Sequence, residues 1–228
     1  MDGREDRSFP FIRLISTASL ACAFASAKTP AHTQTGATMI ALETMKLGSA
    51  PADFEFARTG QGGPGQWVVV EDATAASKRA IEQSSIDRTD FRFPLAVYQP
   101  AMAQNVEVTI RFKPVSGKVD QAGGITVRVT SPNDYYLVRA NALENNVRFY
   151  RIVKGRREQL ATANVKVASG EWHSLGLKAQ NGRFTATFDG KTVHSTNDRT
   201  FLGPGRVALW TKSDSVTRFD QISIQVLP

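Results

Sequence analysis

The second half of the chain is a succession of short segments in which apolar and polar residues alternate. From Val106 to Lys113, every second residue is apolar and its neighbours are charged or polar. A period of two is typical of a β-strand that buries one face and exposes the other. The same pattern recurs further along the chain, at residues 125–130, 135–140, 147–150, 175–177, 184–188, 206–210 and 222–226.

Turn sequences separate these segments. Asp189-Gly190 is the clearest, because a two-residue hairpin turn requires positive φ angles, which Gly tolerates and Asp can adopt. Many short strands with regular turns, and almost no helical periodicity, predict an all-β fold. We expect two antiparallel sheets packed as a β-sandwich of the jelly-roll kind. Further turn signals lie at residues 123–124, 131–134, 154–155, 181–182 and 203–205.

The chain has the length of one such sandwich. All-β sandwiches of about 200–250 residues commonly form a single domain, and a body of roughly 190 residues buries about 70% of the surface of its unfolded chain. We therefore expect one folded domain over residues 40–228. Residues 28–39 are polar and contain Pro and Gly, which predicts a disordered leader before that domain.

The first 27 residues have the composition of an export signal. Three arginines precede an apolar stretch over residues 14–24, and Ala25-Ser26-Ala27 supplies the small residues that a signal peptidase requires. We expect residues 1–27 to be a signal peptide and the mature protein to be periplasmic or secreted. The apolar stretch is too short to span a bilayer, so no transmembrane segment is expected. Cleavage after Ala27 also removes Cys22, the single cysteine of the chain.

The chain is basic, with 28 Lys and Arg against 21 Asp and Glu and a net charge of +7. We interpret these charges as spread along the whole chain, which predicts a solvated basic surface. A nucleic-acid partner requires a clustered basic patch or a recognisable module. We find neither in the sequence and expect no nucleic-acid partner.

Several segments resemble a known superfamily. Residues 171–177 (EWHSLGL), followed by 184–191 (FTATFDGK), resemble a strand pair of the form WHxLxL…F…DG found across concanavalin A-like and laminin G-like domains. Residues 203–212 (GPGRVALWTK), ending in Phe219-Asp220, resemble the closing strands of the same superfamily. The resemblance implies a concanavalin A-like β-sandwich.

A narrower resemblance points to one branch of that superfamily. Residues 112–117, 121–125 and 135–146 are similar to bacterial exported proteins of the keto-disaccharide hydrolase domain family, in a short form. This resemblance covers roughly Leu42 to Val226 and implies that the protein binds or hydrolyses carbohydrate.

Candidate catalytic residues are few. Sandwich glycanases of the laminarinase type place carboxylates on one strand as E-x-D-x-x-E, so that alternation directs them into one cleft as nucleophile and general acid. That motif is absent, and retaining hydrolysis of this type is not expected. For a keto-disaccharide hydrolase the candidate acid/base residues are Glu144 and His173. The alternative for His173 is a strand residue at the edge of the core.

Metal ligands are equally sparse. The three histidines, His32, His173 and His194, have no spacing that forms a zinc site. We expect no metal site and no cofactor, with calcium as the one alternative. Calcium takes several oxygen ligands from a loop, and the candidates are Asp134, Asn141, Glu144, Asn145 and Asn146.

Three arginines have the same parity on successive predicted strands. Arg128, Arg139 and Arg148 all fall on the face opposite the core, and strands joined as a meander would bring them into one patch. Arginines stacked in this way repel unless an anion or a carboxylate lies among them. Glu144, in the connecting loop, is the candidate partner.

A concave sheet face with these residues is suited to a polar or acidic sugar, with Tyr for stacking and Arg and Asn for hydroxyl groups. We predict an exported carbohydrate-binding domain. A glycoside-active hydrolase and a structural envelope protein are the alternatives, and a solvated face with local ion pairs is the alternative to a site. The oligomeric state is left open. The predicted ligand-binding residues are Arg128, Tyr135, Arg139, Asn141, Asn146 and Arg148, with Tyr150 beside them.

Overall fold

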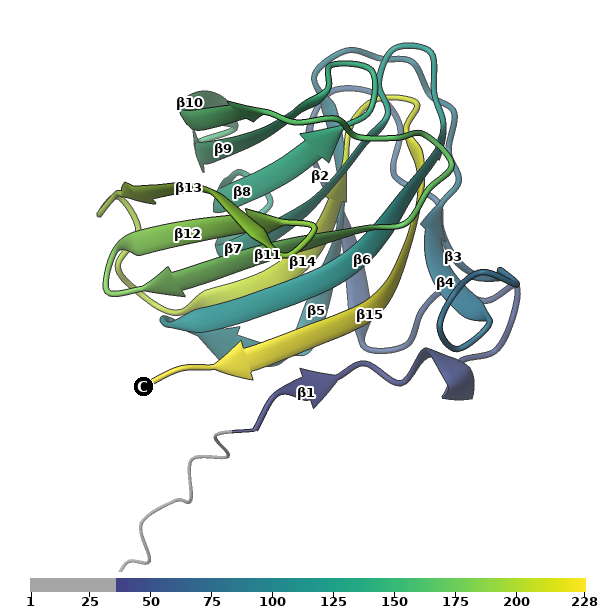
Figure 1. The fold of residues 1–228 in the computed structure, drawn as a ribbon, viewed down its shortest axis with the longest axis horizontal. Helices are drawn as coiled ribbons and strands as arrows, with labels where there is room; N and C mark the ends of the chain where they lie inside the picture. The colour runs from purple at the N-terminus through teal and green to yellow at the C-terminus, as the bar shows by residue number, and fades with distance from the viewer. Residues whose placement is uncertain (1–35) are drawn as a thin grey trace, which may run out of the picture. The chain divides into compact units, whose positions relative to one another are not determined.

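The computed structural model describes residues 36–228, which form two antiparallel sheets packed face to face (Figure 1). The expected signal peptide (1–27) and residues 28–35 of the expected leader lie outside the described residues. Strand β1 (Thr38–Met39) pairs with the last strand, so paired structure begins two residues before the expected start at Ile40. Within the described part of the chain, no helix is long and apolar enough to cross a membrane.

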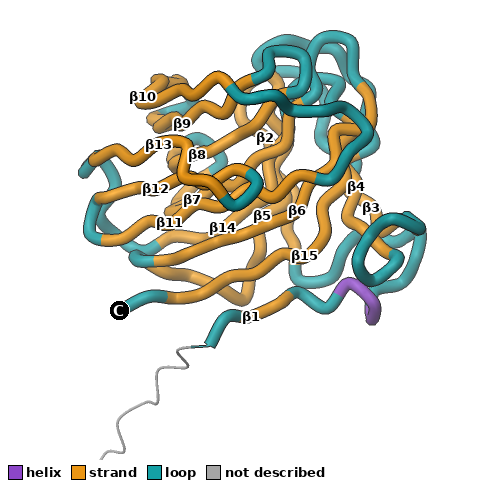
Figure 2. The backbone as a smooth tube through the Cα atoms, in the orientation of Figure 1, coloured by secondary structure: helices purple, strands orange, loops and turns teal. Residues whose placement is uncertain are grey.

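Strands and loops make up nearly all of the described chain, and a 3-10 helix covers Leu42–Thr44 (Figure 2). The remaining strands are β2 (Phe54–Gly60), β3 (Trp67–Glu71), β4 (Arg79–Gln83), β5 (Arg92–Ala103), β6 (Val106–Ser116), β7 (Ala122–Ser131), β8 (Asp134–Asn141), β9 (Asn146–Val153), β10 (Arg156–Asn164), β11 (His173–Gln180), β12 (Arg183–Phe188), β13 (Lys191–Asn197), β14 (Gly205–Thr211) and β15 (Val216–Val226).

The eight-stranded sheet has the order β13-β12-β11-β6-β15-β4-β3, with β1 beside β15, and the seven-stranded sheet has the order β10-β9-β8-β7-β14-β5-β2. Figure 1 shows β8, β9 and β10 in one layer and β6, β11, β12 and β15 in the other. Strands β7 to β10 follow one another in space as they do in sequence, which confirms the expected meander.

The hairpin turns have the expected chemistry. Asp189 and Gly190 both have positive φ, 45° and 75°, between β12 and β13. Lys154-Gly155 adopts the same left-handed pair between β9 and β10. Two positive φ angles match the twist of the flanking strands, which makes these turns tight hairpins.

The core lies between the two sheets and is built by alternate residues of each strand. All eight residues that the alternation places most clearly inside are buried there, which confirms both the fold class and the faces of those strands. They are Val108, Ile110, Val127, Val138, Phe149, Leu177, Phe188 and Leu209.

Candidate functional site

The seven-stranded sheet curls strongly toward its outer face. The hydroxyl groups of Tyr135 on β8 and Thr59 on β2 are 2.8 Å apart, although β8 and β2 are four strand spacings apart in the sheet order. Four spacings of about 4.8 Å would separate flat strands by about 19 Å. The outer face is therefore concave, and side chains from β8 and β2 meet across it.

Aromatic side chains close one part of this concave face. Phe93 and Trp210 stack with ring centroids 5.5 Å apart, and the guanidinium of Arg157 lies over Phe93 and Tyr150. Tyr135 is fully buried among them, and burial raises its pKa to about 12. The expectation that Tyr135 stacks on a sugar does not fit this position, because its ring forms part of a second apolar cluster. We call this part the aromatic region.

Polar side chains occupy the part of the same face that adjoins the loops after β8 and β14. The register pairs Arg139 with Arg148 and Asn141 with Asn146 across β8 and β9. These two cross-strand pairs bring four of the predicted site residues together, with Glu144 from the loop between the strands. We call the whole group the Arg139 cluster: Asp120, Arg139, Asn141, Glu144, Asn146, Arg148 and Lys212.

Glu144 lies between the two arginines, as the sequence predicts. Its Oε2 atom accepts hydrogen bonds from Arg139 at 2.9 Å and from the Asn146 amide at 3.1 Å, and it lies 3.1 Å from the guanidinium of Arg148. Partial burial raises the pKa of the Glu144 carboxyl, but Arg139 and the other donors outweigh it and the net pKa is lowered. Glu144 is therefore held as a carboxylate.

A short turn fixes the position of Glu144. The side-chain oxygen of Asn141 accepts the backbone N–H groups of Leu143 and Glu144, at 2.9 and 3.2 Å. This is the local hydrogen bonding that makes Asn a turn residue. Asn145 completes the turn with a φ of 50°. The loop thus presents Glu144 in one orientation toward β8 and β9.

A second carboxyl, Asp120, lies beneath the cluster. Its Oδ1 accepts a hydrogen bond from the Asn141 amide and its Oδ2 pairs with the Lys212 ammonium, both at 2.5 Å. Its exposed fraction is 1%. This burial raises the pKa of Asp120 even though Lys212 and Arg139 act to lower it. Two carboxyls of one cluster therefore have pKa values displaced in opposite directions.

Arg128 does not belong to the cluster, which corrects the sequence prediction. A β-bulge interrupts β7 between Val127 and Ser131, and Arg128 itself has a φ of 54°. The bulge shifts the alternation by one residue, so that Val127 faces the core and Val129 faces outward. Arg128 donates hydrogen bonds to the backbone oxygens of Gln104 and Phe201 and lies over Phe184 of the core. Its contacts tie loops together.

His173 also lies away from the cluster. It is the first residue of β11 in the eight-stranded sheet, where its Nδ1 is 2.8 Å from the Asp189 carboxylate. Its Nε2 accepts the backbone N–H of Ala168 at 3.0 Å, and its ring packs on Phe112 and Phe188. The alternative interpretation, a strand residue at the edge of the core, describes these contacts.

The five calcium-ligand candidates do not all lie together, although Asn141, Glu144 and Asn146 meet in the Arg139 cluster. Asp134 and Asn141 are the first and last residues of β8, at opposite ends of an eight-residue strand. The side-chain oxygen of Asn145 accepts the backbone N–H of Val167. Among residues 36–228, no group of three or more His, Cys, Asp or Glu side chains is arranged to hold a metal ion.

The outer face of the eight-stranded sheet carries a different set of charges. Asp72 pairs with Lys113 and with Arg218, the latter at 2.9 Å, and Arg218 pairs with Glu82 at 2.6 Å. We call this group the Lys113 network, which also contains Arg111, 3.2 Å from Asp220. It has three bases and three acids. The Arg139 cluster has three bases and two acids.

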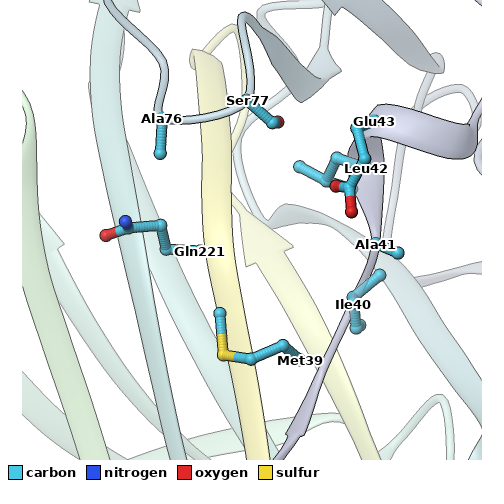
Figure 3. A pocket seen from close by; sticks show the side chains of 8 residues that line it. All are labelled: Met39, Ile40, Ala41, Leu42, Glu43, Ala76, Ser77 and Gln221. Atoms are coloured by element: carbon cyan, nitrogen blue, oxygen red, sulfur yellow. The ribbon is translucent and has the colours of Figure 1, made fainter.

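A hollow of about 330 Å³ lies where β1 and the 3-10 helix meet the turn at Ala76-Ser77 (Figure 3). Figure 3 shows Met39 and Gln221 on one side of it and the carboxylate of Glu43 on the other. Glu43 is the one charged group that lines it, so it offers no set of converging donors.

Asp120 and Lys212 were not predicted as site residues. Both stand in loops, 92 positions apart, and neither has a local sequence signal. They meet at Asn141 because β7 lies between β8 and β14 in the sheet. Knowledge of that strand order would have been needed to find them.

Comparisons with known proteins bear on the fold. No protein-family model matches the chain, and no curated protein matches it. Among solved structures, the chain is similar to the carbohydrate-binding module CBM66 from Bacillus subtilis, with a TM-score of 0.57 and 17% identity over 75% of this chain and 94% of that one. It is also similar to a β-glucanase from Bacillus licheniformis, with a TM-score of 0.52 and 10% identity over 80% and 96%.

A third similar structure is a Bacillus subtilis protein of unknown function with a galectin-like fold, with a TM-score of 0.53 and 9% identity over 75% of this chain and 89% of that one. These similarities show the concanavalin A-like and galectin-like β-sandwich fold. At identities of 17% or less they show the fold alone.

Proposed function

We propose that the protein is an exported carbohydrate-binding domain and that the Arg139 cluster is its binding site. The observation that carries the proposal is a hydrogen-bonded set of donors and acceptors with one positive charge in excess on the polar part of a concave sheet face. The fold supports it, since one similar structure is a carbohydrate-binding module. The basic and apolar N-terminal sequence supports export to the periplasm or the cell exterior.

The accessible atoms of the cluster suit sugar hydroxyl groups. The side chains of Glu144 and Arg148 are 34% and 33% exposed, whereas Arg139 beneath them is 3% exposed. A ligand therefore meets the carboxylate of Glu144 as an acceptor and the guanidinium of Arg148 as a donor. Glu144 is fixed by the buried Arg139 and in turn pairs with Arg148. Such preorganised charged hydrogen bonds are stronger than neutral ones and cost little ordering on binding.

Binding affinity tests the proposal. A glycan array probed with the purified full-length protein identifies a responsive glycan, and calorimetry then compares wild type with Arg148→Ala. Loss of a charge-assisted hydrogen bond of about 1.5–3 kcal/mol should weaken binding by about 10–100-fold. The matched control is Lys178→Ala, an exposed cation of the eight-stranded sheet that pairs with Glu107 at 3.7 Å; it should change affinity by less than about twofold. Equal losses in both variants, or an array with no response, would refute the site.

A hydrolase acting on glycosides, of the keto-disaccharide hydrolase kind, is the second candidate. The opposite displacement of the Asp120 and Glu144 pKa values favours it, because such displacement separates acid from base roles. Asp120 is buried with both oxygens bonded, however, so Glu144 is the one carboxylate of the cluster that can meet a substrate.

Product analysis separates the two candidates. A hydrolase should release sugar from the responsive glycan at a rate that falls by about 10²–10⁴ in Glu144→Gln, while the affinity of that variant changes far less. A binding domain should release no product from any glycan that it binds.

A further inference from the structure

The hairpin of β9 and β10 concentrates positive charge at one edge of the seven-stranded sheet. Residues 146–164 contain five basic residues, Arg148, Arg151, Lys154, Arg156 and Arg157, and a single acid, Glu158. This segment therefore carries four of the chain's seven net positive charges. This hairpin is a local concentration of positive charge, although 23 of the 28 Lys and Arg residues lie elsewhere in the chain.

A hollow of about 640 Å³ lies on this hairpin, lined by Arg151, Lys154, Arg156, Arg157, Glu158 and Thr200. Arg151 is neutralised within it, because it pairs with Glu158 and with Asp198, both at 2.8 Å. Among the described residues, no carboxylate forms an ion pair with the other three cations. Asp134 accepts the backbone N–H of Lys154, and the Lys154 charge helps to lower the pKa of Asp134 although the two side chains form no ion pair.

Arg157 is held in place by stacking. Its guanidinium carbon lies 4.7 Å from the ring centre of Tyr150 and 5.0 Å from that of Phe93. These rings belong to the concave face, so the Arg157 guanidinium lies on the face of the hairpin opposite to Arg151 and Glu158, because successive residues of a strand point to opposite faces. Lys154 and Arg156 stand exposed on either side of the turn at Gly155 and line the hollow. The hollow thus presents two exposed cations beside the paired Arg151.

We propose that this hollow binds the anionic groups of an acidic polysaccharide. Its volume lies within the range of about 300–1,000 Å³ that is usual for ligand pockets. The saccharide part of the proposal rests on the proposed function, and the site is a separate one. The group that the hollow would recognise is a carboxylate or a sulfate attached to a sugar ring.

Single-stranded nucleic acid is the less favoured polyanion. Proteins that bind it combine a basic groove with accessible aromatic rings on which the bases stack. Here no aromatic side chain lines the hollow. The rings beneath Arg157 are buried, with exposed fractions of 4% for Tyr150 and 3% for Phe93.

The test measures the affinity of the full-length protein for polygalacturonate, dextran sulfate and neutral dextran, with a single-stranded DNA of mixed sequence as a fourth probe. The variant is Lys154→Gln with Arg156→Gln, both exposed positions. The matched control is Lys178→Gln with Arg183→Gln, which removes the same charge from the eight-stranded sheet. All proteins are compared by calorimetry at two salt concentrations.

We expect at least one acidic polysaccharide to bind and neutral dextran to bind at least tenfold more weakly. The hairpin variant should lose at least tenfold in affinity, with a weaker salt dependence because fewer counterions are released. The control variant should lose less than about twofold. An equal loss in the control would mean non-specific attraction by net charge and would overturn the site, as would no binding of either acidic polysaccharide.

Binding of DNA as tight as that of the acidic polysaccharides, with the same loss in the hairpin variant, would overturn the assignment to polysaccharide. Arg148→Ala distinguishes failure of this proposal from failure of the proposed function. It should weaken binding of the glycan found by the array by about 10–100-fold while leaving the affinity for the acidic polysaccharide within about threefold of wild type.

Discussion

The two sheets carry charged clusters of similar size on their outer faces, and the clusters differ in balance and exposure. The Lys113 network joins three bases to three acids, with Trp172 stacked over Arg111 and Lys113 at 4.8 and 4.9 Å. None of its paired side chains is more than 27% exposed. The Arg139 cluster has one base in excess and keeps a third of Glu144 and Arg148 exposed.

This difference is the basis for proposing a structural role for one cluster and a binding role for the other. In the Lys113 network every charge already has an opposite charge within the protein, so an added ligand would have to displace a partner. In both groups a single carboxylate oxygen serves two cations, Oδ2 of Asp72 in the Lys113 network and Oε2 of Glu144 in the Arg139 cluster. Arg218 of the Lys113 network also pairs with Glu82, whereas among the described residues Glu144 is the one carboxylate that forms an ion pair with Arg139 and Arg148, which stand directly opposite each other on β8 and β9. Like charges in that position are unfavourable, and a polar or anionic ligand relieves them.

The largest effect is expected from breaking the Lys113 network. Lys113→Met removes one partner of Asp72, whose side chain is 4% exposed. Asp72 keeps Arg218 at 2.9 Å but loses a charge-assisted hydrogen bond in a buried position, so the free energy of unfolding should fall by about 1.5–3 kcal/mol, measured by urea denaturation. Glycan affinity should be unchanged at temperatures where the variant is folded. A loss of glycan affinity without a loss of stability would instead assign a binding role to the Lys113 network.

The pH dependence of stability should differ in sign between two carboxyls, Asp72 of the Lys113 network and Asp120 of the Arg139 cluster. Burial raises the pKa of Asp72, but hydrogen bonds from Lys113, Thr74 and Arg218 outweigh it and lower the net pKa far below the usual value of 3.8. Its stabilising contribution is present above about pH 4 and is lost as the pH falls. Burial raises the pKa of Asp120, so Asp120 favours the folded state when protonated and costs stability as the pH rises past 3.8.

Two amide variants test this difference through the free energy of unfolding between pH 2 and pH 7. Asp72→Asn should remove part of the gain in stability that wild type shows as the pH rises toward 4. Asp120→Asn should remove part of the loss that wild type shows above pH 4. Identical pH profiles for the two variants would show that the two carboxyls have the same environment.

The smallest effect on stability is expected for Arg148→Ala. Arg148 is one third exposed and shares Glu144 with Arg139. Partly exposed ion pairs contribute about 0–1 kcal/mol, so the melting temperature should shift by less than about 4 °C. A large drop in melting temperature would assign the cluster to the scaffold, as in the Lys113 network. Together with the affinity of the same variant, this measurement sharpens the division between the two faces.

Some of the site could be predicted from local pattern. The parity of Arg139 and Arg148, and the place of Glu144 in the loop between them, depend on two adjacent strands and a four-residue connection. The prediction for Arg128 was wrong because a bulge at one residue reverses the parity of the later residues of β7, and nothing in the polar and apolar pattern marks it. The basic hairpin could have been predicted, because five basic residues over ten positions are visible in the sequence. It was missed because the charge was considered over the whole chain and not segment by segment.

Alternation and turn chemistry determined the all-β sandwich, the inward faces of its strands and the left-handed turns, because those features depend on residues close together in the chain. The tertiary structure alone decided which side chains meet on the outer faces of the two sheets. The curl of the seven-stranded sheet buries Tyr135 and Trp210 in the aromatic region, and the strand order brings Asp120 and Lys212 to Asn141. Curl and strand order arise from packing between segments far apart in sequence, which a period of two does not encode.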